Sequence, residues 1–160
     1  MIVRSWRIVK KRYAASAFDG EGGREHGGRW NSAGRPAVYT AGHVSLAILE
    51  IVVHVDMRLA SRYTVIPVAF DGSLIETLPV SRLPVGWRTY PAPSAVVALG
   101  DDWLRSGRTP VLKVPSAVVP SEPNYILNPI HPRFRDIRIG APEELEFDPR
   151  LSRSARSAGR

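Results

Sequence analysis

One acidic side chain, Glu50, interrupts the otherwise uncharged and mainly apolar stretch 44–53. A carboxylate in apolar surroundings must meet a cation, take up a proton or face a pocket, because burying an unpaired charge is costly. The nearest cations that precede it are Arg29 and Arg35. Two interpretations follow. One is a structural Arg–Glu ion pair, and the other is a pocket with Glu50 as its floor and Arg29 and Tyr39 as its walls.

The elements that must position these side chains lie in the same region. Turn residues fill 32–36, and the β-branched and aromatic residues of 37–41 predict a strand. Ser45 can cap the N-terminus of a helix that runs to Val53. This helix is apolar on every face, so we expect it to be buried, although its β-branched end, 51–53, could instead be a strand.

A proline-rich stretch, residues 114–132, carries the second set of candidate side chains. Its five prolines predict a long irregular segment. The polar side chains that it would present are Ser116, Asn124, Asn128 and His131. The asparagines could equally cap turns, and we favour a surface role for the histidine. No G-x-S-x-G motif or H-E-x-x-H motif is present, so neither serine hydrolase chemistry nor a metal site is expected.

The rest of the chain predicts short strands and one further helix. We expect a loop at 19–23, a helix at 95–106 ended by Gly107, and strands at 6–9, 37–41, 62–70, 74–78, 109–114, 137–139 and 145–147. The proline in the 62–70 strand suggests an edge or a bulge. The pattern predicts a single α+β domain over 1–150, with a mixed or mostly antiparallel sheet and a few helices. The remaining residues, 151–160, are expected to form a basic, disordered tail.

Composition narrows the class of protein. The chain has 160 residues, 44% hydrophobic and 23% charged, which is typical of one globular domain. It has no cysteine, so no disulfide or thiolate chemistry is available. The first residues lack a signal-peptide core and no apolar run reaches membrane length, so we expect a cytoplasmic protein without a membrane partner.

The net charge of +7 comes from the two ends of the chain. Residues 1–12 hold five basic groups and residues 150–160 hold four, whereas the stretch between them has 13 basic and 15 acidic residues. Basic tails are usually solubilising or contact a partner. No basic face with interleaved aromatic residues is visible between the ends, so direct nucleic-acid binding is not expected.

Several blocks, in order, resemble the RES-domain family, the toxins of RES–Xre toxin–antitoxin systems. The blocks are Gly27-Gly28-Arg29-Trp30-Asn31-Ser32, Val38-Tyr39-Thr40-Ala41, Leu46-Ala47-Ile48-Leu49-Glu50, Gly100-Asp101, Val114-Pro115-Ser116 and Asn124-Tyr125-x-Leu127-Asn128-Pro129. The resemblance covers residues 4–148. It implies an ADP-ribosyltransferase-like fold and an enzyme with no permanently bound cofactor that takes NAD as a substrate. Such an enzyme breaks the nicotinamide–ribose bond and passes ADP-ribose to water, phosphate or a host protein side chain, which arrests growth.

The resemblance also implies roles for individual residues. Arg29, Tyr39 and Glu50 would be catalytic, and Arg29, Tyr39, Ser116 and Asn128 would bind NAD. The chemistry of these residues agrees with those roles, because a carboxylate can stabilise the cation left on the ribose. Arg29 can hold a phosphate, and the ring of Tyr39 can stack on nicotinamide.

The implied partner is a cognate Xre-type helix-turn-helix antitoxin. Two alternatives remain open at this stage. One is a non-catalytic module that binds a nucleotide or a partner, and the other is a nucleic-acid binder that uses the basic tails.

Overall fold

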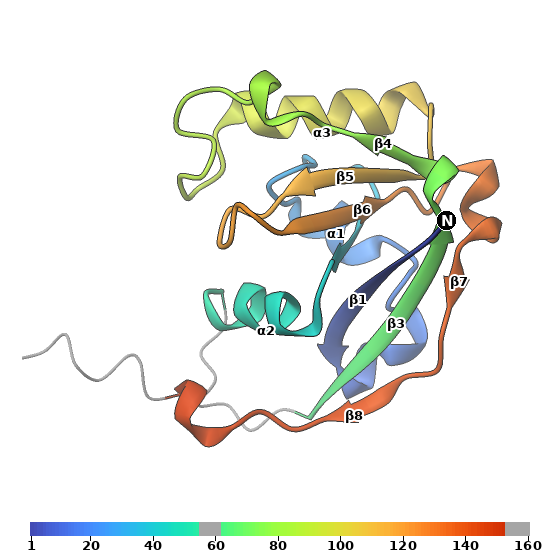
Figure 1. Cartoon of the computed structure of the whole chain (residues 1–160), viewed down its shortest axis with the longest axis vertical. Coiled ribbons are helices and arrows are strands. Elements are labelled where there is room, and N and C mark those ends of the chain that lie inside the picture. The colour runs from blue at the N-terminus through green and yellow to red at the C-terminus, as the bar shows by residue number, and fades with distance from the viewer. Residues whose placement is uncertain (55–61, 153–160) are drawn as a thin grey trace, which may run out of the picture.

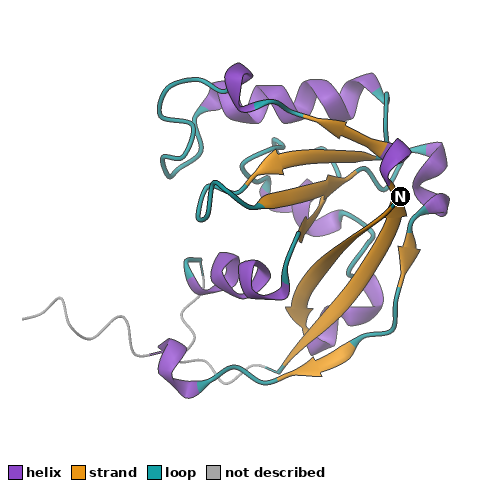
Figure 2. Cartoon of the chain, viewed as in Figure 1, coloured by secondary structure: helices purple, strands orange, loops and turns teal. Residues whose placement is uncertain are grey.

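The structure, a computed structural model, describes residues 1–54 and 62–152. In this part of the chain eight strands form one sheet in the order β4-β5-β6-β2-β1-β3-β7, with β8 also paired to β3 (Figures 1 and 2). The strands are β1 (Ile2–Lys10), β2 (Val38–Ala41), β3 (Tyr63–Asp71), β4 (Ile75–Thr77), β5 (Val111–Pro115), β6 (Pro123–Leu127), β7 (Arg138–Ile139) and β8 (Glu143–Leu145). The helices are α1 (Glu21–His26), α2 (Val44–Val52) and α3 (Ser94–Ser106). Every pairing is antiparallel except that of β4 with β5, which confirms the predicted α+β class.

Two cores form on opposite faces of the sheet because neighbouring strand residues point in opposite directions. In β6, Ile126 joins Trp103 of α3 in one cluster, whereas Tyr125 and Leu127 join Phe70 of β3 in the other. Helix α3 therefore covers one face of the β4–β5–β6 half (Figure 1). No helix among the described residues is long and apolar enough to span a membrane.

The sheet opens at the junction of β1 and β2. These strands pair only at Trp6 and Ala41, whereas β1 pairs with β3 along its whole length. The β5–β6 half and the β1–β3 half diverge from that point, and α2 lies between them (Figure 1). Leu46 and Ala47 hold α2 in place by packing against Ala41. The opening is where a cavity forms.

The proline-rich stretch 114–132 is not the irregular segment that we predicted. It contains β6, which lies between β2 and β5 in the sheet. Pro123 is the first residue of the strand, where its missing N–H is tolerated. Tyr125, Ile126 and Leu127 are all buried, so packing against both cores outweighed the local preference of the prolines.

Helix α2 is correctly predicted as a helix but is not fully buried. Its buried residues are Leu46 and Ala47, while Leu49 is 39% exposed. The residue at its N-cap is His43, not Ser45, and no side chain caps it. Helix α3 begins at Ser94, one residue before the predicted start at 95, and follows Pro93 at its N-cap. Gly107 ends α3 in the left-handed conformation, as predicted.

Four further expectations need correction. The predicted loop 19–23 contains the start of α1. Pro67 lies in a strand that is paired on both sides, at the break between β7 and β8, where its carbonyl accepts the N–H of Gly140. The basic residues of 1–12 do not form a tail, because residues 2–10 are β1 in the middle of the sheet. Of the predicted basic tail 151–160, residues 151 and 152 belong to a 3₁₀ turn that begins at Pro149, and residues 153–160 lie outside the described part.

Candidate active site

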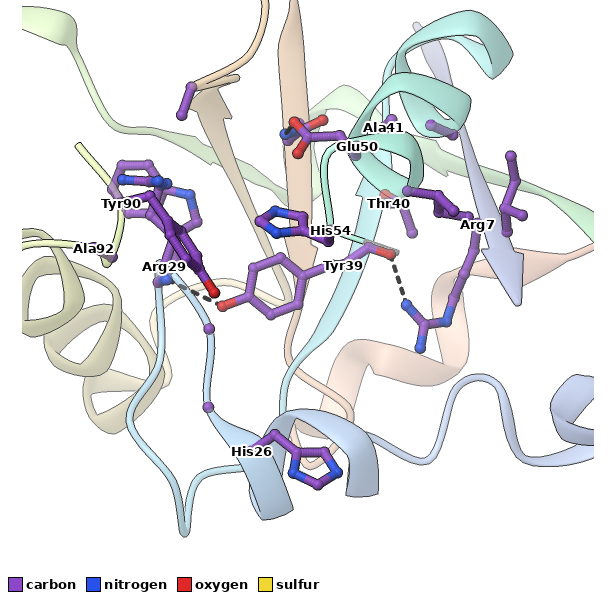
Figure 3. Close-up of a pocket in the computed structure, with 18 of the residues that line it drawn as sticks. Arg7, His26, Arg29, Tyr39, Thr40, Ala41, Glu50, His54, Tyr90 and Ala92 are labelled. Atoms are coloured by element: carbon purple, nitrogen blue, oxygen red, sulfur yellow. Dashed lines mark hydrogen bonds between the residues drawn. The ribbon is translucent and has the colours of Figure 1, made fainter. Parts of the chain in front are cut away.

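A cavity of about 670 Å³ occupies the opening of the sheet (Figure 3). Its walls come from Trp6–Ile8 of β1, Tyr39–Ala41 of β2, Ala47, Glu50 and Ile51 of α2, the turn Gly27–Trp30 and the loop Tyr90–Ala92. A cavity of this volume is in the range of small-molecule and cofactor sites. The predicted residues Arg29, Tyr39 and Glu50 all line it, although they come from a turn, a strand and a helix.

Glu50 lies on the side of α2 that faces the cavity (Figure 3). One of its oxygens, Oε1, accepts two hydrogen bonds, from Ser116 Oγ at 2.8 Å and from Asn124 Nδ2 at 2.7 Å. No arginine within 1–54 or 62–152 forms an ion pair with it, and Arg35 lies 3.7 Å from Asp101 instead. The structure therefore favours the pocket interpretation of Glu50 over a structural Arg–Glu pair.

Ser116 acts on Glu50 and does not line the cavity. The residue is fully buried just after β5, and its hydroxyl accepts the backbone N–H groups of Val118 and Val119, both at 3.0 Å. Because these two donors occupy the oxygen lone pairs, the hydroxyl proton is left to point at Glu50. Contact with substrate, which we predicted for Ser116, is not what this arrangement offers.

Asn128 is not brought to the cavity. It lies 2% exposed at the opposite end of β6 from Asn124, and its Oδ1 accepts the N–H of Ile130 in a turn. Its backbone N–H binds the carbonyl of Pro110. The structure thus gives Asn128 the turn-capping role that we had left open, and it places Asn124 beside Glu50 instead.

Arg29 is presented by a tight turn in which Gly28 and Asn31 form an isolated antiparallel bridge. Its Nη1 donates to the carbonyls of Trp87 at 2.7 Å and Thr89 at 3.0 Å, which ties the turn to the 79–93 loop. Partial burial lowers the pKa of Arg29, and the charge of Glu50 opposes that shift. The guanidinium keeps further N–H groups for an anionic ligand.

The hydroxyl of Tyr39 holds this turn in place while its ring lines the cavity. It accepts the N–H of Trp30 at 3.0 Å and donates to Asn31 Oδ1 at 2.6 Å. Burial raises the pKa of Tyr39, so the phenol stays protonated and can keep donating. A side chain at Gly28 would collide with the Tyr39 hydroxyl, which explains the glycine at that position.

Helix α3 supports the turn from behind. Asp101 accepts the N–H of Ser32 at 2.9 Å and the hydroxyl of Ser32 at 2.6 Å. Gly100 lets the helix backbone come so close that an added Cβ would strike the carbonyl of Trp30. The position of Arg29 is therefore set by α3 as well as by β2.

Sequence reasoning assigned no role to Arg7, His54 and Tyr90, which line the cavity, and it named Asn124 as a candidate that could equally cap a turn. Arg7 donates from Nη1 to the carbonyl of Tyr39 at 2.9 Å, across the opening between β1 and β2 (Figure 3). Burial lowers its pKa to about 10. The available signal was a charge in the middle of the apolar strand 6–9, which we had counted as part of a basic tail.

His54 and Tyr90 lie at the mouth of the cavity with ring centroids 5.5 Å apart. His54 follows α2 and lies one helical turn beyond Glu50, so both can face the same space. The described residues contain no group of three or more His, Cys, Asp or Glu side chains arranged to hold a metal ion.

The fold and the site together define an α+β protein with one carboxylate at the wall of a cleft where the sheet opens. The sequence model of the RES domain family matches residues 4–148 of this chain. The chain therefore belongs to the RES domain family, as its sequence blocks predicted.

Curated relatives agree with this membership. The protein "Toxin Res" of Yersinia enterocolitica is 40% identical over 148 residues, which cover 91% of this chain and 97% of that protein. The "Prs ADP-ribosylating toxin" of a Sphingobium species is 37% identical over 161 residues, covering 97% of this chain and 100% of that protein. A chain in the crystal structure of the M. tuberculosis MbcT–MbcA toxin–antitoxin complex has the same fold. Its TM-score is 0.74 at 19% identity, over 91% of this chain and 85% of that one.

Proposed function

We propose that this protein is the toxin of a toxin–antitoxin module and that it cleaves the nicotinamide–ribose bond of NAD. The observation that carries the proposal is the carboxylate of Glu50 at the wall of a cavity, held by two neutral donors. Because both donors are neutral, they orient the carboxylate without forming an ion pair with it, so its charge is available to a ligand. Relatives named "Toxin Res" and "Prs ADP-ribosylating toxin" support the proposal.

In the proposed reaction the bond between C1″ of the ribose and the nicotinamide nitrogen breaks. The electron pair leaves with nicotinamide, which becomes neutral, and positive charge develops on the ribose. Glu50 stabilises this charge, which is larger in the transition state than in bound NAD, so the interaction accelerates the reaction. An oxygen of the acceptor then bonds to C1″, and any proton that it carries is released.

The other residues of the cavity bind and orient NAD. The guanidinium of Arg29 is suited to the pyrophosphate, because a planar fork of N–H groups matches phosphate oxygens. The ring of Tyr39 offers a face for the nicotinamide. Ser116 and Asn124 hold one oxygen of Glu50, which leaves Oε2 for the substrate.

An enzyme that consumes NAD has to be restrained in the cell that makes it, so an antitoxin partner belongs to the proposal. We expect a cognate antitoxin with an Xre-type helix-turn-helix domain, acting in the cytoplasm. The solved complex that shares this fold is entitled a toxin–antitoxin complex. Adding the purified partner should suppress nicotinamide release, and undiminished release at saturation would count against this part of the proposal.

Substitution of Glu50 tests the function directly. Glu50→Gln keeps an acceptor oxygen for Ser116 and Asn124 but removes the charge. We expect nicotinamide release from NAD to fall about 10²–10³-fold, with an unchanged thermal midpoint. The matched control is Glu146→Gln, which removes an exposed carboxylate outside the cavity and should leave the rate unchanged.

The outcomes separate the proposal from its alternative. Retention of near-wild-type turnover by Glu50→Gln would refute the assigned role. If the unaltered protein binds NAD in calorimetry but releases no nicotinamide over hours, the protein is a non-catalytic binding module.

A further inference from the structure

Strands β1 and β2 diverge at the carbonyl of Tyr39. In the described chain they pair only at Trp6 and Ala41, so a continued antiparallel register would place Ile8 opposite Tyr39. Both of these residues line the cavity instead. The cavity therefore occupies the space in which the two strands would otherwise be hydrogen-bonded to each other.

The backbone of Ile8 is nevertheless directed toward β2. Along an antiparallel strand, successive residues form their backbone hydrogen bonds on opposite sides. At the two ends of β1, the N–H of Gly72 donates to the carbonyl of Met1, and the N–H of Lys11 donates to the carbonyl of Arg62. The odd-numbered residues of β1 therefore bond to β3, and the even-numbered residues, which include Ile8, face β2.

The side chain of Arg7 supplies the donor that the carbonyl of Tyr39 does not receive from Ile8. Its Nη1 lies 2.9 Å from that carbonyl oxygen, as Figure 3 shows. A direct backbone bond would bring the two strands to about 4.8 Å from each other, whereas a bond from a long side chain does not require that approach. The carbonyl is thus satisfied while the strands stay apart.

We propose that Arg7 is a positioning residue that prevents β1 and β2 from pairing beyond Trp6 and so keeps the cavity open for NAD. The part of this inference that concerns NAD rests on the proposed function. The part that concerns the two strands rests on the fold alone.

The surroundings of Arg7 do not explain it as a stabilising residue. Within residues 1–54 and 62–152 its Nε is buried without a hydrogen-bond partner, and no carboxylate forms an ion pair with it. Burial lowers its pKa to about 10, so the guanidinium keeps its charge at pH 7. A buried charge without an ion pair costs stability, and an apolar side chain of similar volume can often replace such a group without loss. Separation of the strands accounts for a side chain that the core itself does not need.

Arg7 also completes the anchoring of Tyr39, whose ring lines the cavity. The hydroxyl end of this side chain is fixed by Trp30 and Asn31, and its backbone is fixed by Arg7. Without Arg7, the carbonyl of Tyr39 would lack its donor, and the N–H of Ile8 is the backbone group directed toward it. Pairing of the two strands would satisfy that carbonyl and close the cavity between them.

The experiment compares Arg7→Met, which keeps the length of the side chain but has no donor, with Arg7→Lys, which keeps a charge and a donor. The matched control is Arg4→Met, which removes an exposed arginine of the same strand outside the cavity. Four quantities are measured: the thermal midpoint, the hydrogen-exchange rate of the Ile8 amide by NMR, the Kd for NAD by calorimetry, and the kinetics of nicotinamide release.

We expect exchange of the Ile8 amide to slow about tenfold in Arg7→Met, because a new backbone hydrogen bond protects it. The thermal midpoint should not fall, whereas the Kd and the KM for NAD should rise at least about tenfold and kcat should change less. Arg7→Lys should lie between Arg7→Met and the unaltered protein in each quantity except the midpoint. Arg4→Met should match the unaltered protein.

Unchanged exchange of the Ile8 amide in Arg7→Met would overturn the inference, as would slowed exchange with an unchanged affinity for NAD. A lower thermal midpoint, or failure of Arg7→Met to fold, would show that Arg7 serves stability and would overturn it as well. These results leave the proposed function standing as long as the unaltered protein releases nicotinamide. If the unaltered protein neither binds NAD nor releases nicotinamide, the proposed function fails, and the exchange of Ile8 still decides whether Arg7 separates the strands.

Discussion

Ser116 and Asn124 donate to the same oxygen of Glu50, at 2.8 and 2.7 Å. Two donors on Oε1 fix the rotation of the carboxylate group and leave Oε2 without a protein partner among the described residues. Both donors are neutral, so they orient the charge without cancelling it. The orientation of this carboxylate therefore depends on two residues that lie 66 and 74 positions away in the sequence.

Asn124→Ala tests whether that direction matters. Loss of one donor lets the carboxylate rotate, and a misplacement of about 1 Å can cost on the order of 10²-fold in rate. We expect kcat for nicotinamide release to fall about 10- to 100-fold while the KM for NAD changes little, because Asn124 acts through Glu50.

Asn128→Ala is the matched control for this variant. It removes a buried asparagine of the same strand region that lies outside the cavity, so it should lower stability and leave kcat and KM unchanged. A rise in the KM for NAD in Asn128→Ala would instead support the substrate-binding role that the resemblance implies.

The two asparagines also show why residue roles were only partly predictable. Both belong to one sequence block, and nothing local distinguishes them. Four residues along a strand correspond to about 13 Å, so only one of them can reach Glu50 once β6 is extended. Which asparagine reaches Glu50 is therefore set by β6, and the prolines around β6 led to the prediction of an irregular segment instead of a strand.

At the scale of elements, α3 and the Arg29 turn are in backbone contact. Gly100 of α3 packs on the carbonyl of Trp30, and an added methyl group would have to displace backbone atoms. We expect Gly100→Ala to destabilise the protein by about 1–3 kcal/mol or more and to raise the KM for NAD, because the turn would move. Urea denaturation and steady-state kinetics measure the two effects.

Gly22→Ala provides the comparison for that substitution. Gly22 lies in α1 with nothing within 4 Å of an added Cβ. Alanine should therefore stabilise the helix by up to about 1 kcal/mol and leave kinetics unchanged. Equal stability changes in the two alanine variants would contradict the backbone contact between α3 and the turn.

The junction after β3 has an electrostatic contribution that depends on pH. Asp71 accepts the N–H of Ser73 at 2.9 Å and lies 3.3 Å from the N-terminal amine. These contacts lower the pKa of Asp71 to about 2, with the Ser73 backbone N–H as the largest cause. Because the folded-state pKa is below the ordinary value of 3.8, the stabilisation is complete above about pH 4 and is lost as the pH falls toward 2.

Asp71→Asn should therefore lower the thermal midpoint at pH 7 but not at pH 2. The control is Asp136→Asn, an exposed aspartate of another turn. A difference between Asp71→Asn and the unaltered protein that stays constant between pH 7 and pH 2 would show that the carboxylate charge is not its cause.

At the scale of the whole molecule, the two basic ends of the chain are not equivalent. Residues 2–10 form β1, which pairs with β2 and β3 and contributes Arg7 to the cavity. Its basic side chains are therefore part of the domain and cannot act as a flexible arm. This arrangement removes half of the basis for a nucleic-acid binder with basic tails.

Two deletions test this difference. Removal of residues 1–10 takes away a central strand, and we expect loss of the cooperative thermal transition in circular dichroism. Removal of residues 153–160, which lie beyond the RES match of 4–148, should change stability by no more than about 0.5 kcal/mol and leave nicotinamide release intact. A loss of activity in the second deletion would assign those residues a role in the reaction.

The sequence by itself determined the family, the α+β class and the three residues Arg29, Tyr39 and Glu50 that line the cavity. These features can be recognised from residue types that lie close together in the sequence, so they do not depend on which distant strands pair. The tertiary structure decided that β6 is a strand, that Asn124 rather than Asn128 meets Glu50, and that β1 supplies Arg7. Those decisions depend on pairings between strands far apart in the chain, whose stability comes from burying both faces of a sheet and not from the preferences of neighbouring residues.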